Sequence, residues 1–252
     1  MKKMIVAALT AAVVQISPVM ANEGGTAWSY QGDTGPANWG KLSEEFSTCS
    51  TGKNQSPINV DPLKNVIEAK QKPIHFDYNV LVPERIINTG HSVQVDMRSG
   101  GKITVDGKDF KLKQFHFHTP GEHKIAGTPF PMEIHFVHVS DDGQIAVVAV
   151  PLKPGRPHPT VASLWRYLPQ KAGESRELPN NAVNSLQLEK DISNYYRYNG
   201  SLTTPPCSEG VIWIIKRAPV SVSKWQVKVL EKVLGYPNNR PLQPANARLV
   251  IE

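Results

Sequence analysis

Residues 111–124 read KLKQFHFHTPGEHK and place three histidines within eight positions. The run that ends at His118 alternates polar and apolar side chains, a pattern typical of a β-strand with one buried face. Side chains at positions i and i+2 of a strand point to the same face. His116 and His118 therefore project together with Gln114, while Phe115 and Phe117 project into packing on the other face.

A second alternating run, MEIHFVHV at residues 132–139, carries two more histidines, His135 and His138, on opposite faces. If the two strands are neighbours, His135 can face His116 and His118. Three convergent neutral imidazoles match a catalytic zinc site with one coordination position left for water. An H-x-H pair alone is weak evidence for a metal, and the third histidine is what strengthens it. Nitrogen ligands favour zinc over magnesium or calcium, although copper and iron fit the same ligand type.

Other polar residues are expected to support this site. Gln114 and Glu133 each lie two residues from a ligand on the same face, where they can accept the second ring N–H and fix the tautomer. We expect His123 and His138 to be structural polar residues beneath the site, and His75 and His158 to occupy surface or turn positions. His91, in NTGHSVQ, follows a glycine and is either a solvated surface residue or close to a cleft.

The rest of the chain predicts a single β-rich domain. Short apolar runs are bounded by turn residues throughout, as in HSVQVDM, ITVDG, IAVVAVPL and EGVIWIIKRAP. Helical patterns are few. HPTVASLWRYL has apolar residues at helical spacing, and SKWQVKVLEKVLGYP begins with a capping-box pair, Ser223 and Gln226, and ends at Gly235.

The N-terminus reads MKKMIVAALTAAVVQISPVMA, with two lysines before a short apolar run. This pattern is typical of a secretory signal peptide, and a membrane anchor is the alternative. We expect cleavage after Ala21, which leaves a domain at residues 22–252. No other run is long and apolar enough to span a membrane.

The charge and the cysteine content indicate which partners and which redox compartment the protein has. The chain has 28 Lys and Arg against 22 Asp and Glu, a net charge of +6, and the basic residues are scattered. This pattern favours solubility over nucleic-acid binding. An exported protein meets an oxidising compartment, so we expect Cys49 and Cys207 to form a disulfide, with two free buried thiols as the alternative. Closing so long a loop would stabilise the fold by about 4–5 kcal/mol at most.

Long motifs carry a family resemblance. QFHFHTPGEH, MEIHFVHV and YNGSLTTPPCSEGVIW, in that order, resemble the α-class carbonic anhydrases. WSYQGDTGPANWGKL, QSPINV, INTGHSVQV and NNRPLQP are also similar to motifs of that family, so the resemblance runs from about Trp28 to the C-terminus. The signal peptide and the cysteine pair resemble the secreted bacterial branch.

The resemblance implies both a fold and a reaction. The fold would be a single α/β domain, β-rich and mainly antiparallel, around a large twisted sheet of about ten strands with short surface helices. The reaction would be reversible hydration of carbon dioxide to bicarbonate and a proton by attack of zinc-bound hydroxide, in a periplasmic or secreted enzyme. Zinc lowers the pKa of its bound water, and carbonic anhydrase is itself the standard example. A homodimer is one option for the oligomeric state.

The resemblance also implies roles for matching residues. His116, His118 and His135 would be the zinc ligands. Thr203 would accept a hydrogen bond from the nucleophile and donate one to Glu122. A hydroxyl can do both because it has one donor and two acceptor sites. Thr204 would hydrogen-bond water or bicarbonate. The carbon dioxide pocket would be apolar and lined by Val137, Val147, Leu202 and Trp213, for which ordinary core packing is the alternative.

His91 matches the position of the family's proton shuttle, since an imidazole can accept and release a proton near neutral pH. Tyr30, Thr89 and Gln94 match positions that order the water chain. Thr89 and Gln94 differ from the asparagines common there in vertebrate relatives. This difference bears on the efficiency of proton transfer and not on the zinc chemistry.

Two other functions are compatible with the resemblance, an inactive binding module and a zinc esterase. The presence of all three histidines with Thr203 and Glu122 disfavours the inactive module.

Overall fold

The computed structural model describes residues 25–69, 72–79, 81–183 and 194–252. The predicted signal peptide at residues 1–21 lies outside the described residues. Within them, no helix is long and apolar enough to cross a membrane.

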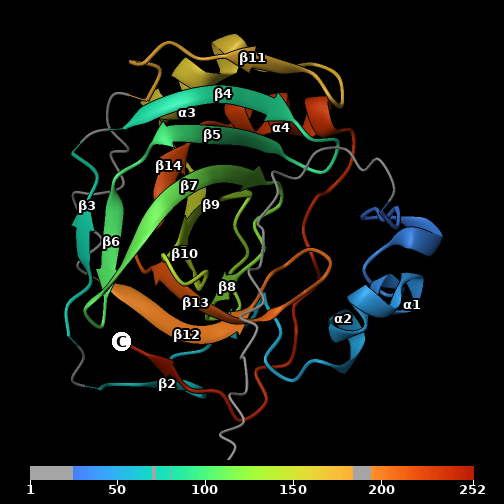
Figure 1. Ribbon diagram of the computed structural model, residues 1–252, viewed down its shortest axis with the longest axis vertical. Coiled ribbons are helices and arrows are strands. Elements are labelled where there is room, and N and C mark those ends of the chain that lie inside the picture. Colours follow the sequence, from blue (N-terminus) through green and yellow to red (C-terminus); the bar gives the residue numbers. More distant parts are fainter. Residues whose placement is uncertain (1–24, 70–71, 80, 184–193) are drawn as a thin grey trace, which may run out of the picture.

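A sheet of thirteen strands forms the body of the molecule (Figure 1). Its main path runs, in order, through β11 (Ser175–Glu177), β4 (Val82–Asn88), β5 (Val93–Ser99), β7 (Lys108–His118), β9 (Met132–Val139), β10 (Ile145–Pro154), β13 (Glu209–Lys216), β12 (Tyr195–Ser201), β15 (Val250–Ile251) and β2 (Val66–Ile67). Off this path, β3 (His75–Asp77) pairs with β6 (Lys102–Val105), β6 pairs with β7, and β14 (Val220–Val222) pairs with β10. A separate two-stranded sheet joins β1 (Asn59–Val60) to β8 (Lys124–Ile125).

The β-rich single domain is confirmed, with a more mixed sheet than expected. Most pairs are antiparallel, but β10 runs parallel to β13 and to β14, and β15 runs parallel to β2. Strands with parallel neighbours are usually buried on both faces and read as continuous apolar runs. That is why IAVVAVPL, in β10, does not alternate. The expected sheet of about ten strands matches the ten strands of the main path, and three short strands add to it off that path.

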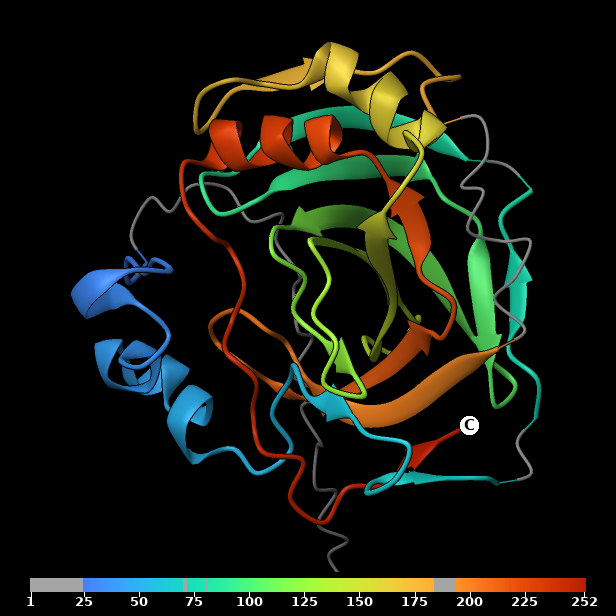
Figure 2. The ribbon, with the colours of Figure 1, turned by 180° about the vertical axis from the view of Figure 1, so that it is seen from behind.

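Helices cover the outside of the sheet (Figure 2). α3 (Pro159–Leu164), its 3₁₀ extension η3 (Trp165–Tyr167) and α4 (Lys224–Leu234) lie along one side. The N-terminal η1 (Gly32–Thr34), α1 (Trp39–Leu42), η2 (Glu44–Phe46) and α2 (Thr48–Thr51) form a separate group. The predicted capping box of Ser223 and Gln226 is present, and α4 ends at Gly235, whose φ of +78° suits a residue without a side chain.

Alternating side chains of the central strands divide the interior into two apolar clusters. In β10, Val148 and Val150 pack into the larger cluster, with Phe115 and with residues of α3 and α4. Val147 and Ala149, which alternate with them along the strand, face the smaller cluster with Trp213. The site described below lies on the side of the smaller cluster.

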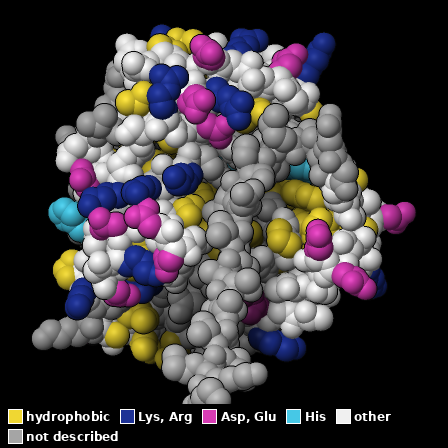
Figure 3. Space-filling view, in the orientation of Figure 1, with side chains coloured by type: hydrophobic (Ala, Val, Ile, Leu, Met, Phe, Trp, Pro, Cys, Tyr) yellow, Lys and Arg dark blue, Asp and Glu magenta, His cyan; other side chains and the backbone are white. Residues whose placement is uncertain are grey.

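Charged side chains of both signs are interspersed on the face shown in Figure 3. Exposed ion pairs such as Lys102–Asp109 and Lys111–Asp141 lie along β6 and β7. Such pairs contribute little to stability, and their mixing fits the scattered charge expected from the sequence.

Candidate active site

Strands β7 and β9 bring the three predicted ligands together. Their antiparallel register sets His116 opposite His135, and His118 opposite Glu133. The ring centres lie 5.0 Å apart for His116–His118, 5.3 Å for His116–His135 and 4.5 Å for His118–His135. One ring nitrogen from each histidine lies within 4.8 Å of the other two, which is close enough to hold a single metal ion.

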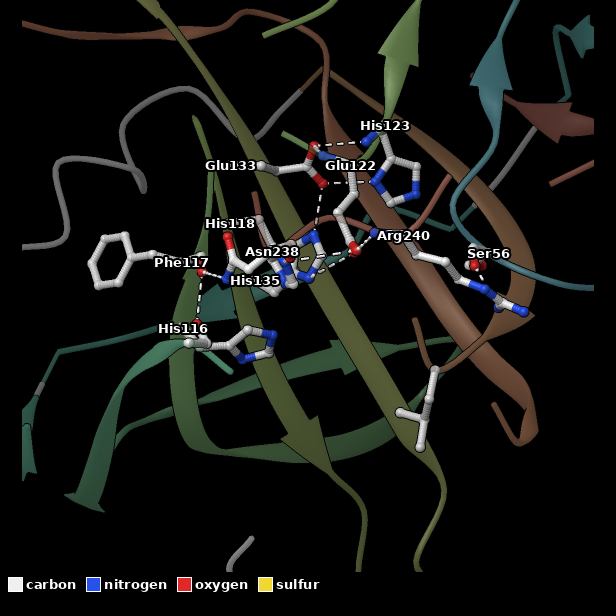
Figure 4. A network of polar contacts seen from close by, with 12 residues as sticks. Ser56, His116, Phe117, His118, Glu122, His123, Glu133, His135, Asn238 and Arg240 are labelled. Carbon is white, nitrogen blue, oxygen red and sulfur yellow. Dashed lines mark hydrogen bonds and ion pairs between the residues drawn. The ribbon is translucent and has the colours of Figure 1, made fainter. Parts of the chain in front are cut away.

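The predicted supporting residues fix two of these rings, and Figure 4 shows one of the two contacts, between Glu133 and His135. His116 Nδ1 lies 2.8 Å from Gln114 Oε1, and His135 Nε2 lies 2.7 Å from Glu133 Oε1. Because both partners are acceptors, the histidine nitrogens donate. The lone pairs of His116 Nε2 and His135 Nδ1 are therefore left for a metal.

The third ring is fixed by a residue that the sequence analysis missed. His118 Nδ1 donates to the backbone oxygen of Asn238 at 2.7 Å. His118 Nε2 is buried and has no hydrogen-bond partner among the described residues. A buried nitrogen without a partner is costly. A zinc ion would satisfy it, so the donor set fits this metal.

Burial keeps the three rings neutral. It lowers the pKa of His118 to about 4, and it lowers the pKa of His116 and of His135, with further lowering from the neighbouring histidines. Neutral imidazole is the form that binds a metal.

Glu133 is the centre of a buried network. Its Oε1 also accepts from His123 Nδ1 at 2.7 Å, and its Oε2 accepts from the backbone N–H groups of Glu122 and His123 at 3.1 and 2.9 Å. Burial alone would raise the pKa of Glu133, but the attraction and hydrogen bonds of His123 and His135 outweigh it and hold the pKa well below its usual range. His123 Nε2 in turn accepts from the Tyr198 hydroxyl at 2.7 Å.

Thr203 and Glu122 are both buried beside the histidines. Glu122 Oε1 accepts from the backbone N–H of Arg240 at 2.8 Å, and Oε2 lies 3.9 Å from His135 Nδ1. Oε2 has no well-formed hydrogen bond in the described part of the chain, yet the Thr203 hydroxyl is near enough to lower the pKa of the carboxyl. Burial is the larger effect and raises the pKa of Glu122 overall.

The four predicted pocket residues form one apolar wall. Val147 pairs with Val137 on one side and with Trp213 on the other, and Leu202 packs against the same cluster. The Trp213 ring lies 4.9 Å from the ring of His135, centre to centre. Val147 and Trp213 are buried, while Val137 and Leu202 are half-exposed.

The segment that carries Thr203 and Thr204 is tied down at its end. The predicted disulfide between Cys49 and Cys207 is present. The backbone N–H of Cys207 donates to Thr204 O at 2.9 Å, and Gln55 donates to Cys207 O at 3.0 Å.

His91 lies in a loop between β4 and β5. Its ring stacks on Trp28 with 3.8 Å between ring centres and an interplanar angle of 10°, and the Tyr30 ring lies 6.5 Å away. His91 Nδ1 has no partner among the described residues, and burial lowers the pKa of the ring.

The other two water-network candidates make contacts of their own. The Thr89 hydroxyl donates to Ser92 O and accepts from the N–H groups of His91 and Ser92. Its one donor and two acceptor sites are thus used within its own turn. Gln94 lies opposite His116 in the β5–β7 register, and its amide donates to Asp96 at 2.6 Å.

The remaining histidines divide into confirmed and corrected positions. His138 lies in the buried layer as expected, with Nε2 2.8 Å from the Tyr78 hydroxyl and Nδ1 2.9 Å from Phe136 O, and His75 is exposed in β3. His158 was expected at the surface and is instead 3% exposed. It precedes α3 at the helix boundary, and its backbone is bonded on both sides to the side chain of Gln226, which packs it under α4.

Comparison with known proteins shows which family has this sequence and fold. The profile of the eukaryotic-type carbonic anhydrase family matches residues 34–252. A carbonic anhydrase from Pectobacterium carotovorum is 40% identical over 89% of this chain and 90% of its own. The α-carbonic anhydrase of Thermovibrio ammonificans, solved with the inhibitor sulfanilamide, superposes with a TM-score of 0.83 at 43% identity, covering 91% of this chain and all of that one. Dioscorin complexed with ascorbate superposes with a TM-score of 0.80 at 35% identity, covering 89% and 97%.

Proposed function

This chain belongs to the α-class carbonic anhydrase family and is a carbonic anhydrase, and we propose that His116, His118 and His135 hold a zinc ion for reversible hydration of carbon dioxide. The observation that carries this proposal is the convergence of three neutral imidazoles whose other nitrogens are already bonded to acceptors. When bound, zinc would lower the pKa of a coordinated water and so supply a nucleophile near neutral pH.

Thr203 and Glu122 orient the reaction. The Thr203 hydroxyl directs its proton to Glu122, so its lone pairs remain to accept a hydrogen bond from the nucleophile. The nearness of Thr203 to the Glu122 carboxylate supports this direction, as does the Arg240 N–H that holds the carboxylate in place.

The apolar wall would receive the substrate. Carbon dioxide has no charge and no hydrogen-bond donor, so contacts from Val137, Val147, Leu202 and Trp213 suit it. The half-buried Thr204 would bind water or the charged product, bicarbonate, at the polar edge of this wall.

His91 would carry the proton away. Each hydration releases one proton that must reach buffer, and an imidazole half-exposed at the edge of the site suits that task. Tyr30 lies beside it and would help to order the solvent between His91 and the site. For Gln94 we propose the same role, and for Thr89 a role in shaping the turn.

We also propose that the protein is exported, with residues 1–21 as a signal peptide and a periplasmic or secreted mature domain. The disulfide supports this setting because such bonds persist in oxidising compartments.

The deciding experiment uses purified mature protein. We expect about one zinc ion per chain by elemental analysis, and carbon dioxide hydration in stopped flow that a chelator abolishes, zinc restores and sulfanilamide inhibits. A folded protein without bound zinc or hydration would contradict the proposal. Ascorbate binding in such a protein would then point to a binding function like that seen in the dioscorin complex.

A further inference from the structure

A short C-terminal segment, residues 236–240, forms hydrogen bonds to two parts of the site that lie far from it in the sequence. It follows α4, and its last three residues begin the motif NNRPLQP, which resembles the family but has no role assigned to it above. We call residues 236–240 the strap.

At the metal side, the strap holds the end of β7 through Asn238. The backbone oxygen of Asn238 accepts from His118, and its backbone N–H donates to Thr119 O at 3.2 Å. Its side-chain Oδ1 accepts from the N–H of Thr119 at 2.8 Å, and its Nδ2 donates to Phe117 O at 2.9 Å. One residue thus bonds to three consecutive residues of the chain around a predicted ligand (Figure 4).

The strap also holds the His91 loop. The same Nδ2 of Asn238 donates to His91 O at 3.0 Å. The Tyr236 hydroxyl donates to Gly90 O. Among the described residues, His91 Nδ1 has no hydrogen-bond partner. The position of His91 therefore depends on these backbone bonds, on the bond from its own N–H to Thr89 and on the stacking on Trp28.

We propose that Asn238 is a positioning residue that sets the distance between the metal-ligand strand and the proton-accepting loop. Its side chain is fully buried and uses both amide hydrogens and its oxygen in this role. A carboxylate of the same shape would lack the two donors, and a smaller side chain would reach none of the three partners. The inference rests on the proposed roles of His91 and His118, but the geometry of the strap can be tested separately.

The test compares three variants. Asn238→Ala removes the bridge. Tyr236→Phe removes only the hydroxyl that holds the loop. Asn239→Ala is the matched control, because Asn239 is the adjacent asparagine, is half-buried and makes no side-chain hydrogen bond in the described part of the chain.

Each variant is measured in three ways. Amide hydrogen exchange on the zinc-free protein follows residues 89–92 and 117–119. Chelator competition gives the zinc affinity. Isotope exchange between labelled carbon dioxide and water separates the equilibrium interconversion of carbon dioxide and bicarbonate from proton transfer, with and without added imidazole buffer.

For Asn238→Ala we expect faster amide exchange in both segments, about tenfold weaker zinc binding, and about tenfold slower proton transfer that imidazole restores. For Tyr236→Phe we expect faster exchange in residues 89–92 and slower proton transfer, with zinc affinity unchanged. Asn239→Ala should match the wild type in every measurement.

Unchanged amide exchange in Asn238→Ala, or proton transfer that falls only in proportion to interconversion, would overturn the proposal. If Asn238→Ala does not fold, Asn238→Ser and Tyr236→Phe decide the matter by the same criteria. If the wild type neither binds zinc nor hydrates carbon dioxide, the proposed function fails, while amide exchange on the zinc-free protein still tests whether the strap holds both segments.

Discussion

The end of the site that we propose binds metal, called the metal end below, and the His91 loop are built in different ways. His116, His118 and His135 stand on two central strands in register, and each ring is held by a specific acceptor. His91 stands on a loop, is half-exposed, and is held through its backbone and by stacking on Trp28. The first arrangement fixes the direction of a lone pair. The second fixes a position, and within the described part of the chain it leaves His91 Nδ1 without a hydrogen-bond partner.

This difference fits the two tasks. A metal needs its donors in one geometry at all times, which neighbouring strands and paired side chains can provide. A proton carrier must exchange protons with solvent, so its ring nitrogens cannot both be committed to protein partners. We therefore expect changes at the metal end to abolish function and changes in the loop to slow one step.

The largest effect is expected from His118→Ala. Loss of this ligand should abolish zinc retention and carbon dioxide hydration, because two imidazoles remain where the site needs three. Zinc content and stopped-flow hydration measure both. The exposed His75→Ala provides the control, and full activity in His118→Ala would remove His118 from the ligand set.

Thr203→Val should produce the next largest effect. Valine has nearly the same shape but cannot bridge the nucleophile and Glu122, so interconversion of carbon dioxide and bicarbonate should fall about 100-fold with zinc still bound. Thr203→Ser keeps the hydroxyl and should recover most of the rate. Equal activity of the valine and serine variants would rule out a role for the hydroxyl.

His91→Ala should have a smaller and more selective effect. Proton transfer should slow by about tenfold, while the equilibrium interconversion rate and zinc affinity stay near the wild-type values. Imidazole in the buffer should restore the lost step. If interconversion fell as much as proton transfer, the loop would belong functionally with the metal end, and the contrast between the two regions would disappear.

The smallest effect concerns pH. Burial lowers the pKa of His91, so the ring stays neutral, and able to accept a proton, at pH values below its ordinary 6.5. The part of hydration that depends on His91 should therefore persist below pH 6.5 and fall as the pH passes through the lowered pKa. Trp28→Ala exposes the ring and should move this midpoint upward, toward 6.5. An NMR titration of His91 checks the direction, and a midpoint above 6.5 in the wild type would contradict it.

Much of the metal end could be predicted from the sequence because it depends on strand periodicity. Alternation alone placed His116 and His118 on one face and Phe115 and Phe117 on the other, and it paired Gln114 and Glu133 with their ligands. The same period-2 pattern identified β5, β7 and β9, and helical spacing identified α3 and α4.

Contacts between distant segments could not be predicted in this way. Asn238 reaches His118 and His91 across more than a hundred residues, and no local pattern indicates which backbone groups an asparagine will meet. The link from Glu133 through His123 to Tyr198 likewise depends on how β12 packs beside the site. His158 was misplaced because its sequence neighbours, prolines and an arginine, suggest a surface turn, while the covering residue Gln226 comes from α4.

The disulfide turns most of the active site into a covalent ring. Cys49 and Cys207 enclose the residues of β1 through β12, and with them His91, the three histidines proposed to bind metal, Glu122 and Thr203. A peptidase that makes one cut within this ring cannot separate the two fragments, because the disulfide still joins them. A cut between Cys207 and α4 leaves α4 and the strap with no covalent link to the rest of the chain. Resistance to peptidases should therefore differ between the two stretches. The more vulnerable stretch is the one that contains the strap, which contributes no side chain to the proposed metal ligands.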